Sequence, residues 1–179
     1  MPLMFGGEHS VTLGAVLAMK ELVGGFKVVN FDAHADMRDT FDFDRYNHAC
    51  VMKRVVDEIG ENKILEIGVR SMAEEEKAFS GRMIFRYELR GNFEAAKKRL
   101  LDFVKDSNVY ITIDMDCFDP GIAPGVGTPE PDGMTYHEVF ELMKVLKAAK
   151  KIVGMDIVEL RPLSDNNVTE MTASKILME

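Results

Sequence analysis

The stretch KVVNFDAHAD, residues 27–36, joins an apolar run to three potential metal ligands at alternate positions. The run over 27–31 is typical of a strand that is buried on both faces of a parallel sheet. Residues i, i+2 and i+4 of an extended segment point the same way, so Asp32, His34 and Asp36 can converge on one point. The stretch therefore predicts a buried strand that ends in a metal-competent cluster.

Five further short runs rich in β-branched residues predict strands over 2–5, 63–69, 82–87, 108–113 and 151–158. Helical patterns alternate with them: after Ser10, over about 48–59, behind capping-box spacings at Ser71/Glu74 and Thr135/Glu138, after Asn92, and from about Val168. This alternation predicts a three-layer α/β/α fold with a mostly parallel sheet. We expect one domain, residues 1–179.

The composition excludes several functional classes. The chain of 179 residues has a formal net charge of −8, which argues against nucleic acid and membrane surfaces as partners and suits a cationic substrate. Cys50 and Cys117 fit neither a disulfide framework nor a thiolate metal site. Neither a signal peptide nor a membrane span is predicted, so we expect a cytoplasmic protein.

Other strand ends carry the same kind of residue. His9 follows the first predicted strand, Asp114 and Asp116 the fifth, and Glu159 the sixth. Ligands of open parallel sheets bind at the carboxyl ends of the strands, and so many carboxylates repel one another unless cations compensate them. Oxygen-rich ligands with a few imidazoles favour a hard ion such as Mn²⁺, and two such ions support hydrolysis.

The strand pattern does not decide the roles of three further side chains, His48, His137 and Asp156. His48 alone is more typical of a surface or capping histidine than of a catalyst, although its loop leaves the strand that bears FDAHAD. We expect His137 to be solvated. Asp156 could be either a buried partner or a support for the site.

The segments GGEHS, FDAHAD, ITIDMDCFDP, GVGTPEPDGMT and DIVELRP, in this order, resemble the ureohydrolase family of arginases and agmatinases. The resemblance implies an arginase-like fold and two Mn²⁺ ions per chain. The implied metal ligands are His9, Asp32, His34, Asp36, Asp114 and Asp116. It also implies that His48 relays a proton, that Asp36 accepts a hydrogen bond from the attacking nucleophile, and that Glu159 pairs with the substrate guanidinium.

Within the family, DAHADMRD followed by NHACVMKRV resembles agmatinases, which implies hydrolysis of agmatine to putrescine and urea. Arginase, guanidinobutyrase and aminopropylagmatine ureohydrolase activities are alternatives. The resemblance also implies a homo-oligomer, a trimer or hexamer.

Family members have a segment before GGEHS that supplies two strands, so we expect a chain that is truncated at its N-terminus and lacks those strands. We also expect a last helix that ends early. A remnant that binds metal without turnover is therefore a second hypothesis, and a single-zinc deacetylase-type enzyme is a third.

Overall fold

The computed structural model describes residues 1–178 and contains a six-stranded sheet in which every strand pair is parallel. Its strands are β1 (Leu3–Phe5), β2 (Lys27–Phe31), β3 (Ile64–Val69), β4 (Met83–Phe85), β5 (Asn108–Asp114) and β6 (Lys151–Val158). Their order is β1-β6-β5-β2-β3-β4, so the longest strands lie inside the sheet and the three-residue strands lie at its edges. The predicted parallel α/β architecture is confirmed.

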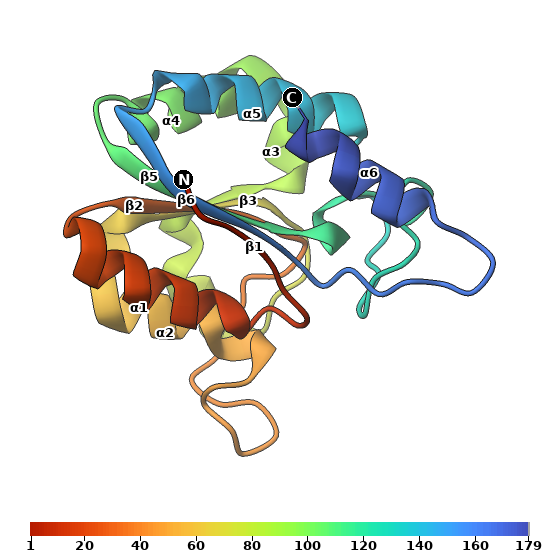
Figure 1. Cartoon of the computed structure of the whole chain (residues 1–179), viewed down its shortest axis with the longest axis horizontal. Helices are drawn as coiled ribbons and strands as arrows, with labels where there is room; N and C mark the ends of the chain where they lie inside the picture. Colours follow the sequence, from red (N-terminus) through yellow and green to blue (C-terminus); the bar gives the residue numbers. More distant parts are fainter. Residues whose placement is uncertain (179) are drawn as a thin grey trace.

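Helices cover both faces of the sheet (Figure 1). The helices α1 (Val11–Val23) and α2 (Val51–Ile59) pack on one face, and α3 (Arg86–Gly91), α4 (Phe93–Val104), α5 (Tyr136–Val145) and α6 (Val168–Leu177) on the other. Short 3₁₀ helices complete the chain: η1 (His48–Cys50), η2 (Glu61–Lys63), η3 (Glu74–Arg82), η4 (Met115–Cys117) and η5 (Leu146–Ala148). Within residues 1–178, none of the helices combines the length and the apolar character that crossing a membrane requires.

Two of the predicted helix caps are confirmed. The Asn92 side chain accepts a hydrogen bond from the Ala95 N–H at 3.0 Å and so caps α4. At α5, Thr135 Oγ1 accepts from the Glu138 N–H at 3.2 Å, and the Glu138 carboxylate accepts from the Thr135 N–H at 2.7 Å. This reciprocal pair is a capping box.

The predicted capping box at Ser71 and Glu74 is wrong. Ser71 instead bridges to His34 at the carboxyl edge of the sheet, and its N–H donates to the Ala33 carbonyl. The carboxylate that closes the first turn of η3 belongs to Glu76, which accepts from the Ala73 N–H at 2.5 Å and from the Met37 N–H at 2.8 Å. Glu76 therefore ties η3 to the loop that follows β2.

The strand predicted over 82–87 is too long. β4 ends at Phe85, whose N–H donates to the Glu88 carboxylate at 2.7 Å, and Arg86 already begins α3. The Arg86 guanidinium donates to Glu138 at 2.8 Å and to the Asp132 carbonyl at 3.0 Å. These tertiary contacts outweigh the weak strand preference of the segment.

Candidate metal centre

The carboxyl ends of four strands meet at one edge of the sheet. The register pairs Phe31 of β2 with Ile113 of β5, Asp114 with Val158 of β6, and Phe5 of β1 with Ile157. The side chains that follow these positions therefore come together although they are far apart in sequence. They are His9, Asp32, His34, Asp36, Asp114, Asp116 and Glu159.

The first cluster surrounds His9. Its Nδ1 atom lies 3.2 Å from Asp32 Oδ2, 3.1 Å from Asp36 Oδ2 and 3.3 Å from Asp114 Oδ2. All four side chains are buried. Adjacent ligands of an octahedral ion with bonds of about 2.1 Å lie about 3 Å apart, so the distances from His9 Nδ1 to these three oxygens are those of neighbouring metal ligands.

The second cluster surrounds His34. Its Nδ1 atom lies 3.0 Å from Asp116 Oδ2 and 3.7 Å from Asp32 Oδ1. Asp32 therefore belongs to both clusters, since one of its oxygens faces His9 and the other faces His34. Among residues 1–178, His9/Asp32/Asp36 and Asp32/His34/Asp116 are the two groups whose ligand atoms all lie within 4.8 Å of one another.

Backbone N–H groups and one hydroxyl hold these carboxylates in place. Asp32 Oδ1 accepts from the His34 N–H at 2.7 Å, and Asp114 Oδ1 accepts from the Asp116 N–H at 2.8 Å. Asp116 Oδ1 accepts from the Ala33 N–H at 3.1 Å, and its Oδ2 accepts from Thr128 Oγ1 at 3.1 Å. The two i to i+2 contacts are Asx turns, which orient each acid as the chain leaves its strand.

The buried charges shift the pKa values of the site. Burial and the nearby Asp32 charge raise the pKa of Asp36 to about 7. Burial and the charges of Asp116 and Asp32 hold the pKa of Asp114 well above its usual range. Burial alone would lower the pKa of His34, but the Asp116 and Asp32 carboxylates raise it to about 11. Without cations this cluster takes up protons, so its residues fit two divalent ions in place of those protons.

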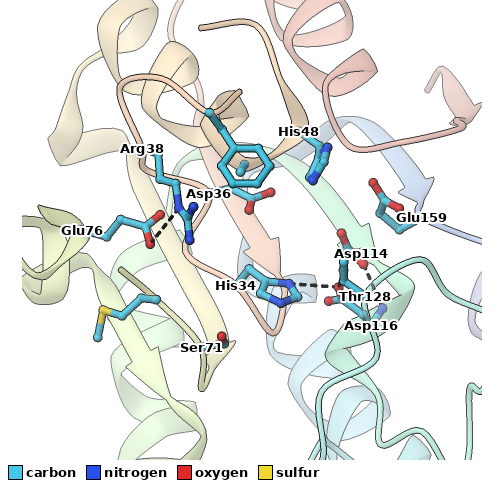
Figure 2. Close-up of a pocket in the computed structure, with 13 residues that line it drawn as sticks. His34, Asp36, Arg38, His48, Ser71, Glu76, Asp114, Asp116, Thr128 and Glu159 are labelled. Carbon is cyan, nitrogen blue, oxygen red and sulfur yellow. Dashed lines mark hydrogen bonds and ion pairs between the residues drawn. The ribbon is translucent and has the colours of Figure 1, made fainter. Parts of the chain in front are cut away.

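A cavity of about 220 Å³ opens over the clusters (Figure 2). It is lined by six of the predicted residues, His34, Asp36, His48, Asp114, Asp116 and Glu159. His9 and Asp32 lie beneath it and are fully buried. The fold thus brings all eight predicted site residues together at one cavity.

His48 begins η1 and lines the cavity. The cap of η1 is the neighbouring Asn47, whose side chain accepts from the Ala49 N–H at 3.2 Å, so His48 is not a capping residue. Its ring meets the Phe41 ring edge-on, with centroids 5.9 Å apart, and its side chain is 40% exposed. His48 therefore contacts both the cavity and solvent.

Glu159 follows β6 with a backbone φ of 59°, and Asp36 has a φ of 50°. Non-glycine residues avoid this left-handed region, at a cost of about 1–3 kcal/mol each, and such strain clusters at functional sites. Glu159 Oε1 accepts from the His9 N–H at 2.8 Å. A Cβ atom at Gly127 would come within 3.1 Å of Glu159 Oε2, so Gly127 leaves that oxygen room. Burial raises the pKa of Glu159.

Seven further residues line the cavity and were not among the predicted site residues: Arg38, Phe41, Ala49, Ser71, Met72, Glu76 and Thr128. The Arg38 guanidinium lies 4.9 Å from the centre of the Phe41 ring, and its Nε lies 4.0 Å from Glu76 Oε2. Arg38 lies on the loop after β2 and Glu76 in η3, so only the fold reveals their contact.

Two predictions remain, those for Asp156 and His137. Asp156 is fully buried and accepts a hydrogen bond from the Tyr110 hydroxyl at 2.6 Å, so it is a buried partner below the cavity. His137 is exposed, as predicted.

Comparisons with known proteins agree with this geometry. The model of a family described as the Arginase family matches residues 1–179. An N(1)-aminopropylagmatine ureohydrolase from Synechocystis is 38% identical over 96% of this chain and 56% of its own length. An agmatinase from Pyrococcus horikoshii is 38% identical over 99% of this chain and 60% of its own length.

Among solved structures, the agmatine ureohydrolase of Thermoplasma volcanium superposes with a TM-score of 0.88 at 41% identity, covering 99% of this chain and 60% of that one. The chain thus spans somewhat more than half of the length of these relatives. The match to the family runs from the first residue to the last. The chain therefore belongs to the arginase family.

Proposed function

We propose that this protein is a binuclear manganese hydrolase that cleaves the guanidinium group of agmatine to give urea and putrescine. The observation that carries the proposal is the pair of ligand clusters joined by Asp32. A single-zinc site would not need a carboxylate with one oxygen turned toward each of two imidazoles.

His9, Asp32, Asp36 and Asp114 would hold one ion, and Asp32, His34 and Asp116 the other. When bound, two divalent ions supply Lewis-acid activation of water at neutral pH. The set is rich in carboxylate oxygen and has no thiolate, which favours Mn²⁺.

Glu159 would bind the substrate. A carboxylate pairs with a planar guanidinium through two parallel charge-assisted hydrogen bonds. Glu159 Oε1 already accepts from the His9 backbone, and this contact fixes the carboxylate at the cavity wall with Oε2 beside Gly127. The guanidinium would then lie in the cavity, on the side of Asp114 and Asp116 that Glu159 faces in Figure 2.

Asp36 and His48 would handle protons. Asp36 lines the cavity and would accept a hydrogen bond from the attacking water. His48 faces the cavity and solvent, so it would carry a proton to the leaving amine and recover one from bulk water. The acidic site attracts a cationic substrate, consistent with the net charge of −8.

The names of the relatives, agmatinase and N(1)-aminopropylagmatine ureohydrolase, support a guanidino compound with an amine tail. The test is urea release by the Mn²⁺-loaded chain from agmatine, aminopropylagmatine, arginine and guanidinobutyrate in parallel. Urea from agmatine at the highest kcat/KM supports the proposal. Urea from none of them, with metal bound, would favour a metal-binding chain without turnover.

A further inference from the structure

A row of polar side chains crosses the sheet directly below the metal ligands. Strand register places Glu66 of β3 beside Asn30 of β2, Asn30 beside Thr112 of β5, and Thr112 beside Asp156 of β6. All four are fully buried. Asn30 lies two residues before Asp32 and therefore on the same face of its strand, so the row lies one layer beneath the site.

Asn30 connects this row to the metal centre. Its Nδ2 donates to Asp32 Oδ2 at 3.1 Å and to Glu66 Oε2 at 2.7 Å. The two carboxyl acceptors fix the amide orientation, because the flipped amide would place an oxygen against both of them. Asp32 Oδ1 accepts from the His34 N–H, so each oxygen of Asp32 is held by one hydrogen bond.

A contribution to folding stability does not explain why a glutamate is buried at position 66. It is fully buried, and its Oε1 atom has no hydrogen-bond partner among the described residues. A buried carboxyl group without a cationic partner costs free energy, whereas an apolar side chain would fill the same place favourably. Within residues 1–178, the one hydrogen bond that the Glu66 side chain makes is the one that holds the Asn30 amide.

We propose that Asn30 and Glu66 are positioning residues for the metal centre. Glu66 fixes the Asn30 amide, and Asn30 fixes Asp32 with one oxygen toward each ligand cluster. The inference rests on the proposed function, because Asp32 is its shared metal ligand. Partners of metal ligands in other proteins change metal affinity by about 10–100-fold when they are removed.

The experiment measures Mn²⁺ affinity and stoichiometry from the electron paramagnetic resonance signal of free Mn²⁺, with the melting temperature of each metal-free variant. Asn30→Ala should weaken Mn²⁺ binding about 10–100-fold. Val29→Ala is the matched control: Val29 is fully buried beside Asn30 but points to the other face of the sheet. It should lower the melting temperature and leave Mn²⁺ affinity within about twofold.

Glu66 is tested by rescue and by non-additivity. Glu66→Gln keeps an oxygen that can accept from Asn30 and should keep most of the affinity, whereas Glu66→Leu should lose it. We infer that Glu66 acts through Asn30. The double variant that combines Asn30→Ala with Glu66→Leu should therefore bind Mn²⁺ no more weakly than Asn30→Ala alone.

If the wild type binds two Mn²⁺, two results would overturn the inference. One is an equal Mn²⁺ affinity of Asn30→Ala and Val29→Ala, and the other is a double variant in which the two losses of Mn²⁺ affinity add. A wild type that binds no Mn²⁺ would overturn both the inference and the proposed metal centre. Two bound ions without urea release would count against the proposed function alone.

Discussion

The edge of the sheet and the outer wall of the cavity are built differently. At the edge, His9, Asp32 and Asp114 are buried, and backbone N–H groups hold the carboxylates. In the wall, the Arg38 side chain is 34% exposed and the His48 side chain 40% exposed, and both contact Phe41.

The difference separates two tasks. A metal centre needs fixed ligand geometry, which strand ends and buried hydrogen bonds provide. Residues of the loop after β2 and of η3 form the outer wall of the cavity. Under the proposed function they would meet the distal part of the substrate and so govern substrate choice. Substitutions at the sheet edge should therefore abolish urea release, and substitutions in the cavity wall should change which substrate is hydrolysed fastest.

The largest effect is expected at the shared ligand. Asp32→Asn removes the one carboxylate that faces both clusters, so kcat/KM for agmatine should fall by at least about 10³-fold and Mn²⁺ stoichiometry below two. Metal analysis after gel filtration, with urea release, checks this. Asp165→Asn, at an exposed position, is the control. Two tightly bound ions in Asp32→Asn would break the assignment of Asp32 as the bridge.

A smaller loss is expected for Glu159→Gln, about 10²-fold in kcat/KM, because a neutral amide replaces the charged partner of the guanidinium. Mn²⁺ binding should stay near the wild-type value, since Glu159 lies outside both ligand clusters. Steady-state kinetics and Mn²⁺ titration of the same sample distinguish a loss of kcat/KM from a loss of Mn²⁺ binding. An unchanged kcat/KM would remove Glu159 from the substrate site.

The outer wall should alter selectivity by about tenfold. The Arg38 guanidinium lines the cavity. It would repel the distal ammonium of agmatine and attract the carboxylate of guanidinobutyrate. Arg38→Gln should therefore raise the kcat/KM ratio of agmatine to guanidinobutyrate about tenfold, with urea release retained. A ratio that stays constant would show that Arg38 serves the structure of the wall rather than substrate choice.

The smallest expected effect is a pH dependence of stability in the metal-free chain. The pKa of Asp36 is raised to about 7 and that of His34 to about 11, so the folded chain holds protons that the unfolded chain has already released. Stability therefore falls as the pH rises from 5.5 to 8, by about 5 °C or more in melting temperature.

Mn²⁺ replaces these protons, so it should raise the melting temperature more at pH 8 than at pH 5.5. Scanning calorimetry at both pH values, with and without Mn²⁺, gives the comparison. A metal-free melting temperature that rises over this interval would contradict the charge arrangement at the edge.

The difference between the sheet edge and the cavity wall also decides which residues of the site can be predicted from the sequence. The ligands Asp32, His34 and Asp36 directly follow an apolar strand, so the sequence predicts that they lie at one strand end. Their division between two clusters appears only in the structure, where β2 ends at Phe31 and Asp36 has a φ of 50°. Asn30 and Glu66 lie inside strands, where a polar residue gives no sign of its neighbour on the next strand until the register is known. Arg38 lies on the loop after β2 and Glu76 in η3, and their contact depends on the whole fold. The wrong capping prediction at Ser71 has the same origin, because Glu76 closes the first turn of η3.

The central claim is a two-ion centre that hydrolyses a guanidinium group, and one titration tests it directly. Increasing Mn²⁺ is added to the metal-free chain with saturating agmatine, and bound Mn²⁺ and urea release are followed together. The account predicts that urea release follows occupancy of the second site and reaches its plateau at two ions per chain. A plateau at one ion, or two bound ions with no urea, would contradict it.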